Sequence, residues 1–298
     1  MKTLNILLFA FILVSCNKST QKHIDYGSNS QAGKYIDIND IKIYYETYGE
    51  GEPLMLFHGN GRSIEGYEFQ IPELSKHFKV IAVDSRGQGR STDSDKEITY
   101  ALMASDMNEM IDKLKLGSVY VFGWSDGGNI GLELAYAHPE KVKKLIAGGT
   151  NYSHENYLTP YDSTIIMDKN DQLVVALKTL RQKRAARASE RLNPIPKSSP
   201  ATQKKLADLM EKYPNFTIEQ LKQINVPTLI AVGDHDLIAL DHTVNLFKSL
   251  PHAQLLIVPD ATHLVLVEQP DLMNKEIIKF LNTPYRDINP YYLFLVPK

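Results

Sequence analysis

Short apolar runs separated by helix-length stretches are the feature of this 298-residue chain that most constrains its fold. Runs that lack alternating polar positions are typical of strands buried on both faces. Such strands form a mainly parallel sheet with helices on both sides, because parallel neighbours are joined by right-handed crossovers. The runs are Leu54–Phe57, Val80–Val83, Val119–Phe122, Leu145–Ala147, Leu229–Val232 and Leu255–Val258.

The segments around these runs carry helical and hairpin patterns. Tyr100–Leu116 and Leu272–Leu281 repeat apolar residues at helical spacing. Ahead of the first run, Tyr35–Ile38 and Ile41–Tyr45 flank the turn pair Asn39-Asp40, a pattern typical of a β-hairpin. Strands and helices alternating in this order predict the α/β class, with a doubly wound, mainly parallel sheet.

The alternation stops between Asn151 and about Phe216, where no apolar strand run occurs. A structureless loop of that length is rare inside a compact domain, so we expect a helical insertion at about 151–216. The insertion contains a basic segment from Lys178 to Arg191. A solvated helix face is the commoner explanation of such charges, and a site for acidic ligands or lipid head groups is the alternative.

Composition limits the partners of the chain. A formal net charge of -2 with 23% charged residues leaves no excess of basic residues for a phosphate backbone, so we expect no nucleic-acid partner. The hydrophobic fraction of 43% is that of an ordinary globular protein. The sequence contains neither a metal-ligand spacing nor a glycine-rich dinucleotide fingerprint, so we expect no metal and no cofactor.

The N-terminus carries the single cysteine of the chain. An apolar run, Leu4–Val14, follows Lys2; it is too short to span a bilayer comfortably and is typical of a signal peptide. Its end, Leu13-Val14-Ser15-Cys16, resembles the lipobox of bacterial lipoproteins, and the resemblance implies cleavage and lipidation at Cys16. An ordinary signal peptide with a chance cysteine and an uncleaved anchor are the alternatives.

These features divide the chain into parts. Residues 1–16 are expected to be a lipoprotein signal peptide and the polar stretch 17–33 a flexible tether. Residues 34–298 are expected to form the folded domain, including the insertion. The protein would then be exported to a bacterial cell envelope and anchored to a membrane by lipid, on the periplasmic or the outer face.

The segment Gly123-Trp124-Ser125-Asp126-Gly127-Gly128 is the strongest chemical signal. It follows the run Val119–Phe122 and precedes the helical run Ile130–Ala137. This is a G-x-S-x-G nucleophile elbow in the strand–turn–helix context that the motif requires. Side chains at Gly123 and Gly127 would collide with the neighbouring strand and helix, so the glycines allow a sharp turn that raises the Ser125 hydroxyl above the sheet.

A serine nucleophile needs a base that is held by a third group. In proteins that carry this elbow motif, the acid follows the serine along the chain, and the histidine follows the acid. Gly233-Asp234-His235-Asp236 comes directly after one predicted strand, and His263 comes after the next. Both segments lie at carboxyl ends of strands, where open α/β sheets bind ligands. The position alone leaves Asp234 and Asp236 open as the acid, with His263 as the base.

The third requirement is a pair of donors for a developing oxyanion. The turn His58-Gly59-Asn60-Gly61 follows a predicted strand and exposes backbone N–H groups. We expect the amides of Asn60 and Asp126 to point at the same oxygen. We expect His58 to pack the loop rather than to act as a base.

With these motifs the chain, from about Lys34 to Asn282, resembles the α/β-hydrolase fold family. The segment Asp84–Ser91 is similar to that family's D-x-R-G-x-G-x-S loop, which we interpret as architectural. The family pattern G-x-x-D favours Asp236 over Asp234 as the acid. The family carries its cap domain at the position of the insertion.

The elbow also resembles that of biphenyl-hydrolase-like esterases, which accept amino-acid esters. In those enzymes the acidic residue after the nucleophile helps to hold the amino group of the substrate, and Asp126 occupies that position here. The resemblance implies that Asp126 and the neighbouring Trp124 contact the substrate.

The motifs together predict a serine hydrolase that cleaves a carboxylic ester, or a related acyl bond, of a small molecule through an acyl-enzyme on Ser125. Hydrolysis of C–C bonds and cofactor-free perhydrolysis are alternatives that related serine triads carry out. A non-catalytic binding module on the same scaffold is the alternative of a different class. The apolar tail Tyr291–Val296 could form an edge strand, cover the domain or contact a partner.

Overall fold

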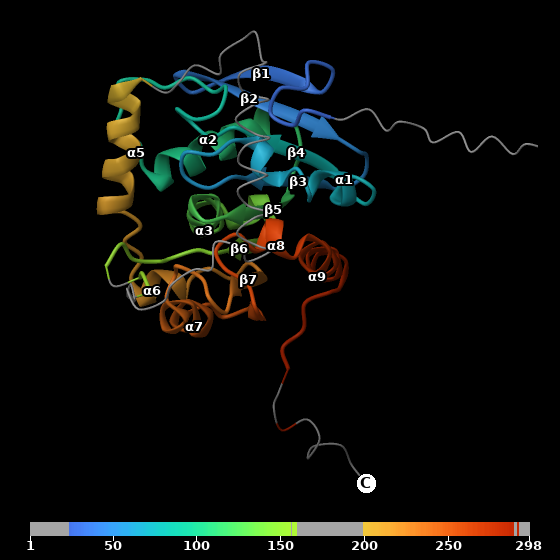
Figure 1. The fold of residues 1–298 in the computed structure, drawn as a ribbon, viewed down its shortest axis with the longest axis vertical. Coiled ribbons are helices and arrows are strands. Elements are labelled where there is room, and N and C mark those ends of the chain that lie inside the picture. Colours follow the sequence, from blue (N-terminus) through green and yellow to red (C-terminus); the bar gives the residue numbers. More distant parts are fainter. Residues whose placement is uncertain (1–23, 156, 160–198, 289–290, 292–298) are drawn as a thin grey trace, which may run out of the picture.

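The computed structural model describes residues 24–155, 157–159, 199–288 and 291 (Figure 1). The predicted signal peptide with Cys16, the tether up to residue 23, and the basic segment from Lys178 to Arg191 lie outside these residues. Most of the apolar tail lies outside them as well. Within the described ranges, the helices are all too short or too polar to cross a membrane.

A mainly parallel sheet forms the centre of the fold. Its strands lie in the order β1-β2-β4-β3-β5-β6-β7-β8. β1 and β2 form the predicted hairpin, β2 runs antiparallel to β4, and all later pairs are parallel. The strands are β1 (Gly33–Ile38), β2 (Ile41–Tyr48), β3 (Pro53–Phe57), β4 (Lys79–Val83), β5 (Val119–Trp124), β6 (Val142–Gly148), β7 (Thr228–Gly233) and β8 (Ala253–Val258). The predicted α/β class and doubly wound sheet are therefore confirmed.

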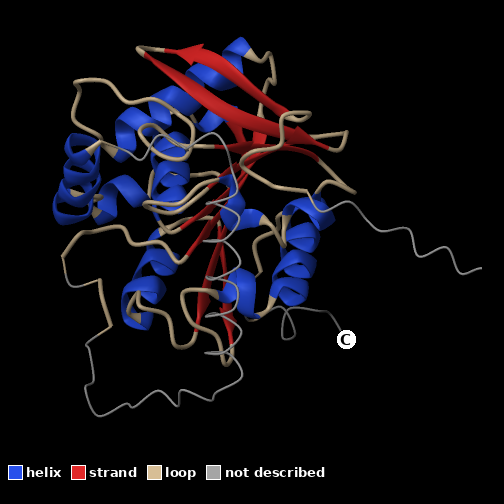
Figure 2. Cartoon of the chain, turned by 45° about the horizontal axis from the view of Figure 1, so that its top comes forward, coloured by secondary structure: helices blue, strands red, loops and turns tan. Residues whose placement is uncertain are grey.

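Helices cover both faces of the sheet (Figure 2). The α-helices are α1 (Ile71–Leu74), α2 (Tyr100–Lys113), α3 (Asp126–Ala137), α5 (Pro200–Lys212), α6 (Ile218–Leu221), α7 (Leu240–Ser249), α8 (Val265–Glu268) and α9 (Pro270–Asn282). Short 3₁₀ helices, η1 and η2, span Ile64–Tyr67 and Pro139–Lys141. The helices α2, α3 and α7 share one apolar core with the sheet, whereas α1, α8 and α9 share the other.

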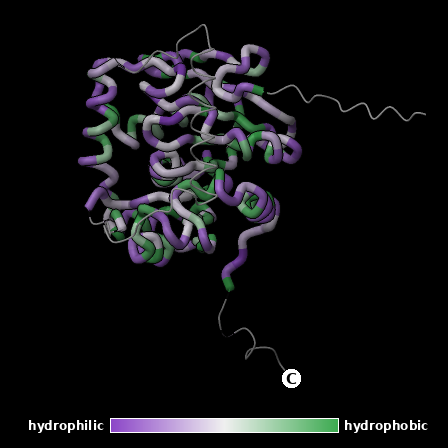
Figure 3. Tube along the Cα trace, in the orientation of Figure 1, coloured by the Kyte–Doolittle hydropathy of each residue, from purple (hydrophilic) through white to green (hydrophobic). Residues whose placement is uncertain are grey.

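The central strands are buried on both faces, as their continuous apolar runs predict. In β3 the side chains of Met55 and Phe57 lie in one core, and those of Leu54 and Leu56 lie in the other. Figure 3 shows the hydrophobic stretches concentrated in the interior of the molecule. Burial on both faces fixes the strand register, because a shift by one residue would exchange the two sets of side chains.

Helix boundaries differ from the predicted ones in α2 and α3, and α9 extends slightly beyond the predicted Leu272–Leu281 at both ends. α2 ends at Lys113 rather than Leu116, because Lys115 adopts a φ of 53° and Gly117 a φ of 70°, both left-handed. α3 begins at Asp126, directly after the nucleophile position, although its first turn is glycine-rich. Tertiary packing against β3 and β5 therefore outweighs the low helix propensity of glycine there.

The chain is attached to the domain from Tyr26 onward, although the polar composition of residues 17–33 predicts a flexible tether up to residue 33. Glu46, which is fully buried, accepts hydrogen bonds from the backbone N–H groups of Gly27 and Asn29, each at 2.8 Å. Tyr26 is 8% exposed and belongs to the core under β2. The composition of residues 17–33 predicts a flexible tether, whereas the described part of that stretch is attached from Tyr26 onward. A buried carboxylate requires hydrogen-bond donors, and the N-terminal segment supplies them.

The described part of the insertion is helical in α5. A bridge between Ser153 and Asn215 joins the two ends of the insertion to each other, and a bridge between Leu158 and Ile238 connects its first part to the loop that follows β7. Residues 160–198 lie outside the described part of the chain.

Candidate active site

Ser125 stands on a strained turn between β5 and α3. Its φ of 56° and ψ of -124° lie in a region that side chains rarely adopt. A β-carbon on Gly123 would lie 2.0 Å from the carbonyl oxygen of Gly127, and one on Gly127 would lie 1.8 Å from that of Phe57. Both collisions involve backbone, so this tight turn requires glycine at both positions, as the sequence predicts.

His263 is held by a carboxylate from the loop after β7. Its Nδ1 lies 2.7 Å from Oδ1 of Asp236, which is 4% exposed. Asp236 Oδ1 also accepts the backbone N–H of Ile238 at 2.9 Å, which fixes the carboxylate. Asp234, the other candidate for the acid, binds different groups. Its Oδ1 contacts His235 Nδ1 at 2.7 Å and accepts the backbone N–H of Ala261 at 3.2 Å.

Ser125 and His263 line the same cavity. A β-carbon on Gly149 would lie 2.8 Å from Cε1 of His263, so this glycine leaves room for the imidazole. Trp124 Nε1 donates to the backbone carbonyl of His263 at 3.1 Å and so links the two loops. No hydrogen bond joins the Ser125 hydroxyl to His263 in the described part of the chain. Such bonds are often long without substrate and tighten when it binds.

The two predicted oxyanion donors both line the cavity, and the backbone N–H groups of Asn60 and Asp126 donate to no described residue. The N–H of Asp126 is free because this residue begins α3. The turn that carries Asn60 is fixed on two sides. The Asn60 side chain donates to the carbonyl of Leu206 at 3.1 Å, and the N–H of Gly61 donates to Gln88 Oε1 at 2.6 Å.

His58 packs the oxyanion turn from beneath and is 2% exposed. Its Nε2 accepts the backbone N–H of Ser85 at 3.0 Å, so the proton of the neutral ring lies on Nδ1, which donates to the carbonyl of Gly59 at 2.8 Å. Burial lowers the pKa of His58 to about 4. A neutral, buried imidazole with both nitrogens occupied is a structural group.

The loop Asp84–Ser91 also holds the turn in place, through Ser85 to His58 and through Gln88 to Gly61. Asp84 accepts the backbone N–H of Ile64 at 2.9 Å and that of Arg90 at 2.8 Å. Arg86 is fully buried and binds both carboxylate oxygens of Asp106 at 2.8 Å. These buried contacts are consistent with an architectural role of the loop.

The cavity above Ser125 has a volume of about 320 Å³ and mostly apolar walls. The wall residues that sequence patterns did not indicate are Tyr67, Met210, Leu237, Leu264, Leu266 and Val267. They come from four separate segments of the chain, so only the folded structure brings them together. Trp124 also lines the cavity, where we expected a contact with substrate.

Asp126 contributes a buried carboxyl to this cavity. The residue is 6% exposed, and its Oδ2 has no hydrogen-bond partner among the described residues. Burial raises the pKa of Asp126 to about 6, and hydrogen bonds from Tyr100 and Asn60 oppose that shift. The group is therefore mostly ionised at neutral pH and lacks a full set of donors.

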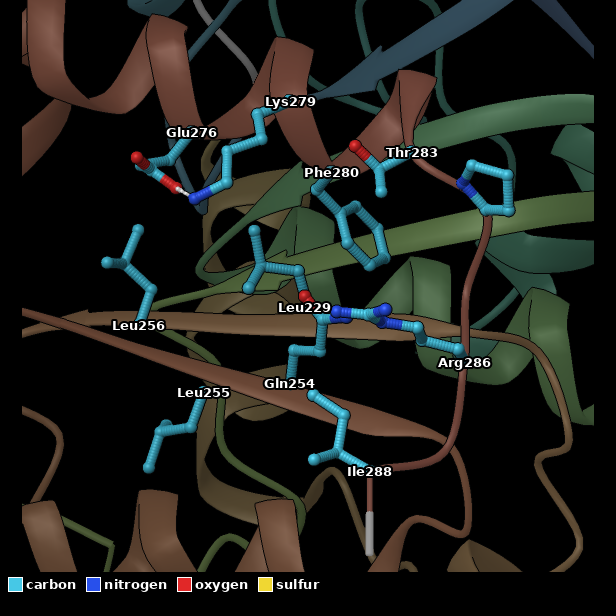
Figure 4. Close-up of a pocket in the computed structure, with 11 residues that line it drawn as sticks. Leu229, Gln254, Leu255, Leu256, Glu276, Lys279, Phe280, Thr283, Arg286 and Ile288 are labelled. Atoms are coloured by element: carbon cyan, nitrogen blue, oxygen red, sulfur yellow. Dashed lines mark hydrogen bonds and ion pairs between the residues drawn. The ribbon is translucent and has the colours of Figure 1, made fainter. Parts of the chain in front are cut away.

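Another cavity, of about 300 Å³, lies between β8, α9 and the segment 283–288 (Figure 4). Leu229, Leu256 and Phe280 form its apolar wall, and Lys279 pairs with Glu276 at 2.9 Å. The two cavities are similar in size, so size does not distinguish them. Only the first brings a serine, a carboxylate-bound histidine and free backbone N–H groups together, and we therefore take it as the candidate active site.

Comparison with known proteins shows the family to which the chain belongs. The family model described as alpha/beta hydrolase fold matches residues 52–270. The human serine hydrolase BPHL is 26% identical over 270 residues, which cover 86% of this chain and 88% of that protein. The 2-hydroxy-6-oxo-6-(2'-aminophenyl)hexa-2,4-dienoic acid hydrolase of Metapseudomonas resinovorans is 25% identical over 267 residues, or 84% of this chain and 90% of that protein.

Solved structures give the same fold. A meta-cleavage product hydrolase from Pseudomonas fluorescens aligns with a TM-score of 0.68 at 21% identity, covering 85% of this chain and 98% of that one. At this identity the likeness concerns the fold alone. Because the family model spans more than half of the sequence, the chain belongs to the alpha/beta hydrolase fold family.

Proposed function

We propose that the protein is a serine hydrolase that cleaves a carboxylic ester, or a related acyl bond, through an acyl-enzyme on Ser125. One observation carries the proposal: His263, bound to Asp236 at 2.7 Å, shares a cavity with Ser125. The sharp elbow raises the hydroxyl, and the carboxylate orients the base.

In the proposed reaction His263 Nε2 removes the proton of Ser125 Oγ while this oxygen attacks the carbonyl carbon. The backbone N–H groups of Asn60 and Asp126 stabilise the resulting oxyanion. Collapse of the tetrahedral intermediate breaks the bond to the leaving alcohol, which receives the proton from His263. A water molecule then attacks the acyl group by the same route and releases the acid. Throughout, Asp236 keeps the proton of His263 on Nδ1 and stabilises the imidazolium.

The test is hydrolysis of 4-nitrophenyl esters by the wild type and by matched variants. Ser125→Ala should lower kcat by at least about 10³-fold, and Asp236→Asn should lower it by up to about 10⁴-fold, as is typical of triad acids. Asp234→Asn, a matched control two residues away, should keep most of the activity, because Asp234 contacts His235 instead of His263. Equal losses in both Asp→Asn variants would contradict the assignment of the acid.

The same assay addresses the other chemistries. If no ester is cleaved while a fluorophosphonate still labels Ser125, hydrolysis of a C–C bond or perhydrolysis becomes the better explanation. If the fluorophosphonate does not label the protein either, a non-catalytic binding module becomes the better explanation.

An amino group on the substrate is the specificity that Asp126 supports. Its Oδ2 is buried and has no partner among the described residues, and an ammonium group would supply the missing donor. We therefore propose that α-amino esters are accepted, with Trp124 beside the same cavity. Esters with and without the α-amino group should differ in kcat/KM, and the difference should disappear in Asp126→Asn. Equal rates for both esters in the wild type would refute this specificity.

For the N-terminus we propose export and a lipid anchor at Cys16, supported by the lipobox-like end of the apolar run. The enzyme would then act at a membrane of the cell envelope.

A further inference from the structure

Arg62 is a cation at the candidate active site that pairs with none of the residues that the structure describes. Its side chain lines the cavity that contains Ser125 and is exposed to solvent. It makes no ion pair and no side-chain hydrogen bond with any described residue. An unpaired arginine on an open surface is ordinary, so its position in the cavity is what gives it significance.

The described lysines of α5, beside this cavity, all form ion pairs. The helix α5, which supplies Met210 to the cavity wall, carries three lysines. They form ion pairs as follows: Lys204 with Asp208 at 2.7 Å, Lys205 with Asp93 at 3.1 Å, and Lys212 with Glu97 at 3.0 Å. Arg62 therefore differs from the lysines of α5 in having no ion-pair partner within the described part of the chain.

The backbone that carries Arg62 is held in place. Its N–H donates to the carbonyl of Gly59 at 3.2 Å, and the neighbouring Gly61 and Ile64 donate to buried side chains of the supporting loop. Arg62 also lies two residues after Asn60, a proposed oxyanion donor. The fixed turn holds the backbone of Arg62 at a constant distance from the proposed oxyanion donors, and the side chain extends into the cavity from there.

No described wall residue forms an ion pair with this guanidinium. Among the described lining residues, the other charged group is the buried Asp126, and most of the rest are apolar side chains or backbone. A cation beside an apolar wall attracts anions into the cavity, because the low dielectric of the wall screens it poorly. The planar guanidinium matches a carboxylate in a bidentate geometry.

We propose that Arg62 binds a carboxylate on the substrate, away from the scissile bond, so that the preferred substrate is an apolar ester with a free acid group. The inference rests on the proposed function for the reaction, but not for the binding of the anion. It is compatible with an α-amino group at Asp126, since different side chains would hold the two charges.

The test compares 4-nitrophenyl hydrogen glutarate with its uncharged counterpart, 4-nitrophenyl valerate. In the wild type the acid should have the higher kcat/KM, and added salt should reduce the preference. In Arg62→Gln the ratio of the two kcat/KM values should fall about tenfold, mainly through KM, and Arg62→Lys should retain part of it. The matched control is Arg286→Gln, an exposed arginine at the other cavity, which should leave the ratio unchanged.

Two results would overturn the proposal. One is the same ratio in the wild type and in Arg62→Gln. The other is an equal loss for both esters together with a lower melting temperature, which would make Arg62 a structural residue.

If no ester is cleaved, the proposed function fails but the inference is still measurable. Titration with hexanoate should change the fluorescence of Trp124, the single tryptophan, which lines the cavity. Binding about tenfold weaker in Arg62→Gln would support the anion site. Equal binding by both proteins, or no saturable signal in either, would refute it.

Discussion

Replacing Gly127 with alanine tests whether the elbow geometry holds the site together. The added β-carbon would lie 1.8 Å from the carbonyl oxygen of Phe57 and 3.0 Å from that of His58. Both obstacles are backbone atoms of the strand end that leads into the oxyanion turn. They cannot move aside as a side chain can, so α3 and this strand end must separate.

The size of the effect follows from these distances. Real β-carbons essentially never approach within 3.0 Å of a neighbour, so a contact of 1.8 Å requires a shift of at least about 1 Å. Overpacking of this kind typically costs about 1–3 kcal/mol of folding free energy. The shift also separates Ser125 and the N–H of Asp126 from the N–H of Asn60. A misplacement of about 1 Å at a reacting group costs about 10²-fold in rate.

The assay pairs ester hydrolysis with thermal unfolding, and Gly131→Ala is the control on the same helix. There the β-carbon would meet Leu145 Cδ1 at 2.6 Å, the end of a side chain that can rotate. Alanine should improve helix propensity equally in both variants. We expect Gly127→Ala to lose about 10²-fold in kcat/KM and Gly131→Ala to lose much less. Wild-type activity and stability in Gly127→Ala would refute the reasoning.

Two further predictions concern pH and localisation. His242 lies in α7, where its Nε2 accepts the backbone N–H of Tyr152 at 3.0 Å. Burial lowers the pKa of His58 and of His242 to about 4, below the value of 6.5 expected in the unfolded chain, so the unfolded state binds these protons more tightly. The free energy of unfolding that comes from the two neutral rings is complete above about pH 6.5 and is lost as the pH falls toward 4. The loss is up to about 3 kcal/mol for His58 and smaller for the less enclosed His242. Urea unfolding between pH 7.5 and 5 measures this loss of stability, and NMR titration of the two rings measures their pKa values in the folded protein. Titration midpoints near 6.5 for the folded protein would contradict the prediction. For the N-terminus, Cys16→Ser should release the protein from the membrane fraction of a bacterial host, and unchanged fractionation would exclude a lipid anchor at this residue.

The strands could be predicted because each central one is buried on both faces. Leu54–Phe57 and Leu229–Val232 appear as continuous apolar runs, and the structure contains them within β3 and β7. The start of α3 could not be predicted, because Gly127 and Gly128 have low helix propensity and only packing makes them helical. The attachment of Gly27 to Glu46 depends on a contact nineteen positions away, which leaves no local pattern.

The candidate site was predictable only in part, for a similar reason. Motifs at the ends of strands indicated Ser125 and His263, because chemistry at such turns requires particular residue types. Spacing alone did not separate Asp234 from Asp236; the direction of each carboxylate depends on loop geometry, and Asp236 is the one beside His263. Arg62 belongs to no motif and becomes visible only when the cavity wall is complete.

The central claim is that Ser125 is a nucleophile activated by His263, and the most direct measurement is the site of covalent modification by a fluorophosphonate. After reaction and digestion, mass spectrometry should locate the phosphonyl group on Ser125. The rate of labelling should fall at least about 10²-fold in His263→Ala, because the base that removes the proton is gone. Modification at another residue, or labelling that persists in Ser125→Ala, would contradict the account.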